Sequence, residues 1–348
     1  MSATIKDIAR HLGVSVSTVS YALNGGPRSV GNAVRARVLA AASELDYRPN
    51  HLARTLITGR SFTIGVVPTE LTTNLTKSPY FAGCLDGIVN AAEALGQDVL
   101  LYTRFDQTSP VAFVNALLDG RADGLLFLAP IVDSPALGQL SGKIPIAIAS
   151  GMDVPGHPSF TCDNRNGVHQ AIAHLVNLGH TRIGNLHGNL HLVDGIERLD
   201  AFRAAMTEYG GDIREEWIAS GGFTPMGGFD AGYSLLAASP RPTAIFCAND
   251  EMAAGLIQAA YSLGLSVPED ISVVGFDDAP SASLVHPGLT TVRQPLEELG
   301  AAALHALIAQ INGDATAPHV QFETELIIRK STTSPKEDPC NLSHVHLH

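Results

Sequence analysis

Polar side chains follow several short apolar segments of the chain, in positions where they could bind a small polar molecule. Carboxylate, amide and imidazole groups form hydrogen bonds with the hydroxyl and N–H groups of a ligand. Open parallel sheets bind their ligands beyond the carboxyl ends of the strands. For Asp250 and Asp278, capping of the following segment is an equally good interpretation. The polar residues at these ends are Ser150, Asp163, Asn164, His187, Asn249, Asp250, Asp277 and Asp278.

The segments that must position these side chains alternate between strand and helix patterns. Helical stretches lie between the strands, and the stretch 81–95 carries an apolar stripe that includes Cys84 and Ile88. A repeated β-then-α order predicts an α/β fold with parallel sheets that are covered on both faces. About 270 residues are enough for two such domains. Apolar runs typical of buried strands occur at 63–67, 99–102, 124–128, 144–149, 182–186, 244–247 and 272–276.

Motifs of catalysis and nucleotide binding are missing from this α/β region. No Gly-x-Gly-x-x-Gly or Gly-x-x-x-x-Gly-Lys-Ser/Thr sequence follows a predicted strand, so we expect no dinucleotide or triphosphate site. The region also lacks a Gly-x-Ser-x-Gly nucleophile motif, paired carboxylates at helical spacing and a set of metal ligands. We therefore expect neither a cofactor nor a metal, and we predict that the protein is not an enzyme.

The first 48 residues have the pattern of a small helical domain. Thr4 and Asp7 are placed as a capping box, and Ser15 is placed to cap a second helix over 16–23, before a third helix over 32–46. Two short helices joined by a glycine-containing turn are typical of a helix-turn-helix, whose second helix can enter the major groove of DNA. A helical domain that docks another protein is the alternative. The outward-facing positions of the second helix are Val16, Ser17, Ser20 and Tyr21.

The charge of the chain is divided unevenly. The 348 residues carry a formal net charge of −12. Residues 1–61 hold eight basic and three acidic side chains, a charge of +5, whereas the other 287 residues hold 14 basic and 31 acidic groups, a charge of −17. Such an asymmetry predicts a basic arm that meets a polyanion and a separate acidic body.

Other classes of protein are disfavoured by the sequence. No apolar run approaches the roughly 18 residues of a membrane span, and the N-terminus does not resemble a secretory signal. Three cysteines, Cys84, Cys162 and Cys247, lie in apolar surroundings, and we expect reduced core thiols in a cytoplasmic protein. The histidines of the C-terminal tail are interpreted as part of a flexible segment.

Two stretches of the basic segment carry a more specific signal. They are I-K-D-I-A-R-H-L-G-V-S-V-S-T-V-S-Y-A-L-N at 5–24 and R-V-L-A-A-A-S-E-L-D-Y-R-P-N-H-L-A-R-T-L at 37–56. Both resemble the LacI/GalR family of transcription regulators, as do C-A-N-D-E-M-A-A-G at 247–255 and P-E-D-I-S-V-V-G-F-D-D at 268–278, and the similarity continues to about residue 333. The resemblance implies a helix-turn-helix headpiece, a hinge helix and a two-lobed effector domain similar to periplasmic sugar-binding proteins.

The resemblance also implies which residues contact DNA. The hinge over 50–57 would fold on DNA and insert Leu56 into the minor groove, where an apolar wedge kinks the duplex. From the residues alone, an ordinary interdomain linker is the alternative for this segment. Tyr21 stands where the family usually has arginine, so the operator sequence cannot be transferred. The implied DNA-binding residues are Thr4, Ser15, Val16, Ser17, Thr18, Ser20, Tyr21, Asn24, Asn50, His51, Ala53, Arg54 and Leu56.

The resemblance places a small-molecule effector between the lobes of the body. A carboxylate and a guanidinium suit vicinal hydroxyls, and aromatic rings suit an apolar sugar face or a base ring. For Phe81 and Phe223, plain core packing is the alternative. Ser150 replaces an aspartate of some sugar-responsive members, so a nucleobase remains an alternative to a sugar. The implied effector-binding residues are Tyr80, Phe81, Ser150, Arg198, Phe223, Asn249, Asp277 and Gln294.

These inferences predict a ligand-controlled transcriptional repressor that binds palindromic operator DNA as a homodimer. A solute-binding protein for transport is the alternative from another class. The tail has no apolar heptad, so no further coiled-coil assembly is expected. The predicted domains are 1–48 (helix-turn-helix), 49–61 (hinge and linker), 62–333 (effector binding and dimerisation) and 334–348 (flexible tail). Within the body, the N-lobe comprises 62–162 and 293–323, and the C-lobe comprises 163–292 and 324–333.

Overall fold

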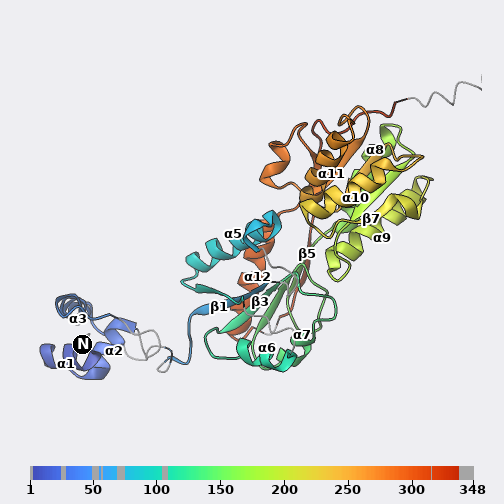
Figure 1. Ribbon diagram of the computed structural model, residues 1–348. Coiled ribbons are helices and arrows are strands. Elements are labelled where there is room, and N and C mark those ends of the chain that lie inside the picture. Colours follow the sequence, from blue (N-terminus) through green and yellow to red (C-terminus); the bar gives the residue numbers. More distant parts are fainter. Residues whose placement is uncertain are drawn as a thin grey trace, which may run out of the picture. The chain divides into compact units, whose positions relative to one another are not determined.

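The computed structural model describes residues 3–24, 29–48, 55, 58–68, 75–103, 109–314 and 316–336. The chain divides into two compact units, Met1–Phe62 and Thr63–His348, which are described separately (Figure 1). In the described residues no helix is both long enough and apolar enough to cross a membrane.

The first unit is a helical domain formed by α1 (Ile5–Leu12), α2 (Val16–Asn24) and α3 (Asn32–Glu44). The three helices pack around a core of Ile8, Ala9, Val19, Ala22, Val38, Ala41 and Ala42. The predicted capping box is confirmed, since Asp7 N donates to Thr4 Oγ1 and Thr4 N donates to Asp7 Oδ2. The predicted cap of α2 is also confirmed, because Thr18 N donates to Ser15 Oγ at 3.0 Å.

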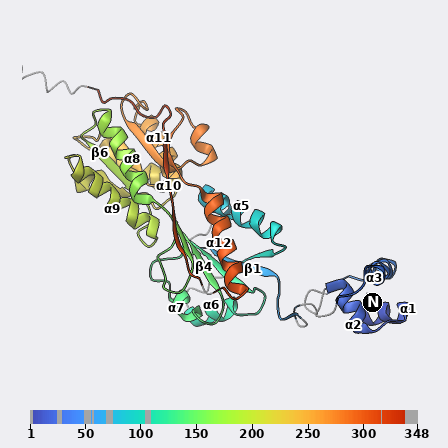
Figure 2. The ribbon, with the colours of Figure 1, turned by 180° about the vertical axis from the view of Figure 1, so that it is seen from behind.

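The N-lobe of the second unit is built on a parallel sheet with strand order β11-β5-β4-β3-β1-β2. Its strands are β1 (Thr63–Pro68), β2 (Asp98–Leu101), β3 (Gly124–Leu128), β4 (Ile146–Ala149), β5 (Ser159–Cys162) and β11 (His319–Phe322). The helices are α5 (Pro79–Ala94) and α12 (Leu296–Ile311) on one face, with α6 (Pro110–Leu117) and α7 (Pro135–Leu140) on the other (Figures 1 and 2). Alternation along β3 serves both faces, since Leu126 packs toward α5 and α12 and Phe127 packs toward α6 and α7.

The C-lobe repeats this arrangement with strand order β12-β10-β9-β8-β6-β7. Its strands are β6 (Ile183–His187), β7 (Ile218–Ser220), β8 (Ala244–Cys247), β9 (Ser272–Asp277), β10 (Thr290–Arg293) and β12 (Glu325–Ile327). Helices α8 (Asn164–Asn177) and α9 (Val193–Glu208) pack with one apolar cluster, and α10 (Pro225–Ala237) and α11 (Asp250–Ser262) pack with another. All pairs are parallel except β10 with β12. The predicted α/β class with parallel sheets is confirmed.

The chain passes between the lobes in three described connections. They join β5 to α8, β10 to α12 and β11 to β12. Asn164 begins α8 directly after the first connection, and Gln294 lies within the second. A change in the angle between the lobes would therefore alter the backbone conformation or the contacts of residues at these connections.

Two predictions outside the sheets concern the cysteines and the C-terminal tail. Cys84, Cys162 and Cys247 are buried and unpaired, which confirms the predicted core thiols, and burial raises the pKa of Cys84 to about 12. The flexible tail over 334–348 stays a prediction, and its first residues, 334–336, lie within the described part. Lys336 Nζ lies 2.6 Å from Asp270 Oδ1, so an ion pair holds this part of the chain on the C-lobe. Residues 337–348 lie outside the described part.

Candidate functional site

The first unit presents the start of α2 to solvent. Val16 is 46% exposed and Ser17 is also exposed, while Ser20 and Tyr21 are half-buried. Val19, on the other side of the helix, is fully buried in the core of this unit. The predicted outward orientation is therefore confirmed for Val16 and Ser17, and the exposed face of α2 begins at its N-terminus, where backbone N–H groups also favour a phosphate.

Hydroxyl groups near the start of α1 and α2 form short hydrogen bonds. Ser15 Oγ lies 2.8 Å from both Ser17 Oγ and Thr18 Oγ1. The hydroxyl of Thr4 donates to Asp7 Oδ2 at 2.6 Å. These contacts hold the end of the turn in one conformation. Asn24 is the last residue of α2, and the predicted DNA-binding residues that lie outside the described part are Asn50, His51, Ala53, Arg54 and Leu56.

A cavity of about 340 Å³ lies between the two lobes of the second unit. The N-lobe contributes Lys77, Ser78, Tyr80, Phe81 and Ala129 to its wall. The C-lobe contributes Asn189, Leu192, Asp194, Arg198, Gly222, Phe223, Thr224, Pro225, Asn249, Glu251 and Asp277. A volume of this size, with apolar rings and a few polar groups, is typical of a small-molecule site.

The lobes also touch each other beside the cavity. Val132 N donates to His191 O at 2.9 Å, and Ile131 pairs with Leu192 in an isolated antiparallel bridge. These residues belong to the loops that follow β3 and β6. The loops bring the two lobes into direct backbone contact at the edge of the cavity.

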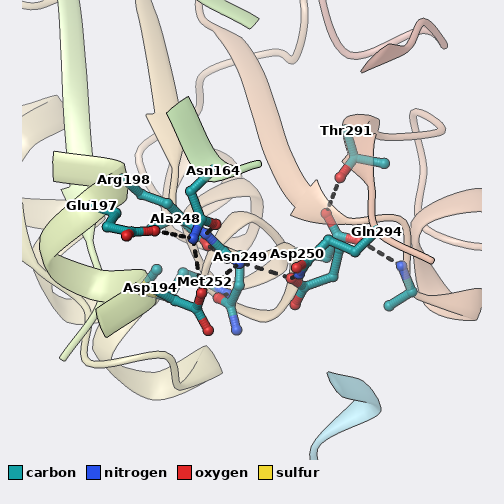
Figure 3. A network of polar contacts seen from close by, with 12 residues as sticks. Asn164, Asp194, Glu197, Arg198, Ala248, Asn249, Asp250, Met252, Thr291 and Gln294 are labelled. Atoms are coloured by element: carbon teal, nitrogen blue, oxygen red, sulfur yellow. Dashed lines mark hydrogen bonds and ion pairs between the residues drawn. The ribbon is translucent and has the colours of Figure 1, made fainter. Parts of the chain in front are cut away.

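Arg198 is the centre of the polar wall and is only 2% exposed (Figure 3). Its Nε donates to Asn164 Oδ1 at 2.8 Å, and its Nη1 donates to Ala248 O at 2.6 Å. Nη1 also lies 3.4 Å from Asp277 Oδ1. The guanidinium carbon is 3.8 Å from the ring centroid of Phe276, which supports it from behind. Several contacts therefore fix the position of this buried charge.

Asn164 connects Arg198 to two further carboxylates (Figure 3). Its Nδ2 donates to Asp194 Oδ1 at 2.9 Å and to Glu197 Oε2 at 2.7 Å. Burial raises the pKa of Glu197, although the hydrogen bond from Asn164 acts in the opposite direction. Because Asn164 begins α8, the amide joins a lobe connection to the wall of the cavity.

Asp277 is the buried partner of Arg198 and is held from the second lobe connection. Gln294 Nε2 donates to Asp277 Oδ1 at 2.6 Å. Burial raises the pKa of Asp277 to about 6, while the Arg198 charge and the Gln294 hydrogen bond oppose this rise. A carboxyl with such a pKa is sensitive to any charge that a ligand brings near it.

Asn249 and Asp250, at the start of α11, both form hydrogen bonds with the backbone. Asn249 caps α11 by accepting from Met252 N at 2.9 Å, so the interpretation of Asp250 as a cap is wrong. The carboxylate of Asp250 turns inward and accepts from Ala279 N at 2.7 Å, and burial raises its pKa.

The capping interpretation of Asp278 is also wrong. This carboxylate accepts from Arg293 Nε at 2.8 Å and from Arg329 Nη2 at 2.6 Å. The two arginines engage both of its oxygens, so the side chain links β10 to the chain that follows β12.

Backbone strain gathers around the cavity. Five non-glycine residues there or directly behind it have a positive φ: Ala129 (47°), Ser150 (51°), Phe223 (61°), Asp277 (114°) and Asp278 (52°). Each such residue costs about 1–3 kcal/mol, and such residues cluster at binding sites. The Phe223 ring covers Gly188 so closely that a side chain at Gly188 would overlap it.

The structure brings together most of the predicted effector-binding residues. Ser150 and Gln294 are not part of the cavity wall. Ser150 is buried with a hydroxyl that has no hydrogen-bond partner among the described residues, and Gln294 supports Asp277 from behind. The predicted residues that do line the cavity are Tyr80, Phe81, Arg198, Phe223, Asn249 and Asp277.

Sequence reasoning missed several lining residues, above all Asp194 and Glu251. Asp194 precedes Arg198 by one helical turn, and this spacing was an available signal. Glu251 lies two residues after the capping Asn249, but nothing local shows which way its side chain points. In the described part of the chain, no group of three histidine, cysteine or acidic side chains is arranged to hold a metal.

Comparison with known proteins places both units in recognised families. Residues 4–50 match the family described as bacterial regulatory proteins, lacI family, and residues 172–332 match the periplasmic binding protein-like domain. The chain is 36% identical over 339 residues to the HTH-type transcriptional repressor PurR of Yersinia pestis (strain Pestoides F). That alignment covers 94% of this chain and 96% of the relative.

Solved structures agree with these matches. A lac repressor dimer bound to operator and the anti-inducer ONPF superposes with a TM-score of 0.85 at 30% identity, covering 96% of this chain and 100% of that chain. A complex of the transcriptional regulator CelR with cellobiose has a TM-score of 0.74 at 31% identity, covering 94% of this chain and 99% of that chain. The chain therefore belongs to the LacI family and is a DNA-binding transcriptional repressor of that family.

Proposed function

We propose that a small-molecule effector, a sugar or sugar derivative, binds in the cavity between the lobes and controls the affinity of this repressor for its operator. The observation that carries the proposal is the buried Arg198–Asp277 pair on a wall that also holds Tyr80, Phe81 and Phe223. A paired donor and acceptor suits vicinal hydroxyls, and aromatic faces suit the apolar side of a ring.

A nucleobase is the second candidate, and two observations favour it. The three aromatic side chains could enclose a flat ring. The PurR relative also aligns over almost the whole chain. In favour of the sugar, the structurally similar CelR is in complex with cellobiose.

The proposal places DNA binding in the helices of the first unit and in the hinge over 50–57. The start of α2 would read base edges through Val16, Ser17 and Tyr21, and the hinge would insert Leu56 into the minor groove. Palindromic operators require two such units, so the working form is a homodimer in the cytoplasm.

Closure of the lobes would transmit the signal. Asn164 and Gln294 lie at two lobe connections and hold Arg198 and Asp277, so an effector that moves this pair changes the preferred angle between the lobes. In a dimer, that angle would set the distance between the two hinges. An effector shifts this equilibrium only by the difference between its affinities for the two states.

A thermal-shift screen of sugars and nucleobases against the full chain tests the proposed function. A ligand of the cavity raises the free energy of unfolding by RT ln(1 + [L]/Kd), which is about 2.7 kcal/mol at a concentration of 100 Kd. The same ligand should change the affinity for an operator selected from random-sequence DNA. A screen with no stabilising compound, or a stabilising compound without effect on DNA binding, would contradict the proposal.

Replacing Leu56 with alanine should weaken binding to the selected operator about tenfold to hundredfold, because the apolar wedge contributes roughly 1–3 kcal/mol through the kinked duplex. Fluorescence anisotropy of the labelled operator measures the loss. The matched control is Leu39→Ala, which truncates a leucine on α3 that is 52% exposed. Equal operator affinities for Leu56→Ala and Leu39→Ala would rule out the hinge assignment.

A further inference from the structure

Glu251 has an unusual position on the wall of the cavity. It lies in the first turn of α11, is half-buried and lines the cavity. Within the described residues its carboxylate makes no hydrogen bond and no ion pair. A carboxylate that is withdrawn from water without a partner is unfavourable, so this position favours a ligand that supplies a positive charge or a strong donor.

The charges around Glu251 do not balance within the cavity. Among the described residues, the cavity wall carries the acidic side chains of Asp194, Glu251 and Asp277 and only two cations, Arg198 and Lys77. Arg198 already contacts Asp277 and donates to Asn164 Oδ1 and Ala248 O. Lys77 is exposed to solvent. The negative charge of Glu251 is therefore left for the ligand to neutralise.

Other polar atoms of the wall require acceptors on the same ligand. Arg198 Nη2 is buried and has no hydrogen-bond partner in the described part of the chain, and it lies 3.9 Å from Asp194 Oδ1. Asn249 uses its Oδ1 to cap α11, which leaves its Nδ2 group for a ligand. In Figure 3 the ends of the Asp194 and Asn249 side chains extend to the same side of the network around Arg198.

The aromatic side chains of the wall are fixed in place. Tyr80 and Phe81 lie in the first turn of α5, with their ring centroids 5.2 Å apart in an edge-to-face arrangement. Phe223 has a φ of 61° and is seated against Gly188. Such faces suit a compact ring more than a flexible chain.

We propose that the effector is an amino sugar, with its protonated nitrogen at Glu251 and its hydroxyl oxygens at Arg198 and Asn249. The inference rests on the proposed function and narrows the class of effector. It assigns to Glu251 a role in specificity: its negative charge favours a cationic ring over the neutral or anionic ring of the same shape.

Burial and the nearby Asp277 raise the pKa of Glu251 to about 7. The charged groups that share the cavity with it are Asp277 on β9, Asp194 and Arg198 on α9, and Lys77 in the turn Leu75–Lys77. A cationic ligand requires the ionised carboxylate, so its affinity should fall as Glu251 becomes protonated. The expected loss approaches tenfold per pH unit below about pH 7, with a steeper fall below the pKa of Asp277 at about 6.

Isothermal titration of the full chain with three sets of ligands tests the inference. The probes are glucosamine, galactosamine and mannosamine, the parent hexoses, and the hexose 6-phosphates, which present the same rings with a positive, neutral or negative charge. At least one amino sugar should bind at pH 7 at least tenfold more tightly than its parent hexose. The 6-phosphates should bind most weakly. Between pH 7 and 5.5 the amino sugar should lose more affinity than its parent hexose, because only the amino sugar depends on the charge of Glu251.

Glu251→Gln keeps the shape of the side chain and removes its charge. This substitution should lower the affinity for the amino sugar at least tenfold and flatten the dependence of that affinity on pH near pH 7. The affinity for the parent hexose should not change. Glu298→Gln is the matched control, because Glu298 is also a first-turn glutamate but lies exposed on α12, outside the cavity wall.

The outcomes separate this inference from the proposed function. Tighter binding of a hexose, a 6-phosphate or a nucleobase, or an amino-sugar affinity that Glu251→Gln does not change, would overturn the inference and leave an effector site in the cavity. The absence of binding by all amino sugars would also overturn it. The proposed function as well would be removed by a complete lack of ligands in the wider thermal-shift screen, or by a stabilising ligand that has no effect on operator binding.

Discussion

Replacing Arg198 with alanine is expected to lower the free energy of unfolding of the second unit by about 3–5 kcal/mol at pH 8, because the variant leaves buried carboxylates without their cation. Asp277 would lose its contact at 3.4 Å, and Asn164 would lose the donor to its Oδ1. Chemical denaturation, followed by the fluorescence of the buried Trp217, measures the change.

The size of this loss should depend on pH in a defined direction. The Arg198 charge opposes the rise of the Asp277 pKa, so its removal moves that pKa further above 6. A carboxyl whose folded-state pKa lies above its unfolded-state value destabilises the fold when it is ionised and ceases to do so when it is protonated. The penalty of Arg198→Ala should therefore be largest above pH 7 and shrink toward pH 5.

Two further variants test whether the loss of stability in Arg198→Ala results from the loss of its buried charge. Arg203→Ala removes another arginine of α9, one whose bond to Glu215 lies at the surface, and it should cost less than about 1 kcal/mol. Arg198→Lys retains the charge without the planar fork, so it should fall between the wild type and Arg198→Ala in stability. If Arg198→Ala and Arg203→Ala have equal effects, Arg198 does not act as the counter-charge of this site. Arg198→Ala should also abolish the response to any effector found in the screen.

Replacing Gly300 with alanine is expected to destabilise the N-lobe by about 3 kcal/mol, because a Cβ at this position of α12 would overlap the Cys84 carbonyl oxygen of α5. Gly87 makes the reciprocal contact, since its Cβ would overlap the Glu297 carbonyl oxygen. The two helices cross at backbone contact, and a backbone carbonyl cannot move aside as a flexible side chain can. Thermal unfolding measures the loss.

Gly138→Ala is the matched control for this prediction. Gly138 lies in α7, and nothing comes within 4 Å of the position of its Cβ. Alanine should be neutral there or stabilise the protein by up to about 1 kcal/mol through its better helix propensity. Since α5 also carries Tyr80 and Phe81, Gly300→Ala should weaken effector binding as well. Similar melting temperatures for Gly300→Ala and Gly138→Ala would refute the close-contact explanation.

The sequence correctly predicted structural features whose interacting residues are only a few positions apart. Thr4 with Asp7, and Ser15 with Thr18, cap helices over three residues, so residue types and spacing predicted both caps. The long central strands were also visible, because strands that are buried on both faces appear as continuous apolar runs.

The strands missed by the sequence have weaker patterns. Strands β7, β11 and β12 are only partly buried, and β10 begins with two buried threonines, Thr290 and Thr291. Neither a half-exposed edge nor a buried threonine produces an apolar run, so pattern reasoning could not find these strands.

The sequence by itself determined the family, the α/β class of the body and the division of charge between a basic first segment and an acidic remainder. Only the tertiary structure decided which carboxylates face the cavity. Arg198 and Asp277 meet across 79 residues of sequence, and Asn164 meets Arg198 across 34. The exposure of Glu251 to the cavity depends on how α11 packs beside β9. Such contacts follow from the packing of distant elements, whereas helix caps and apolar runs are encoded within a few residues.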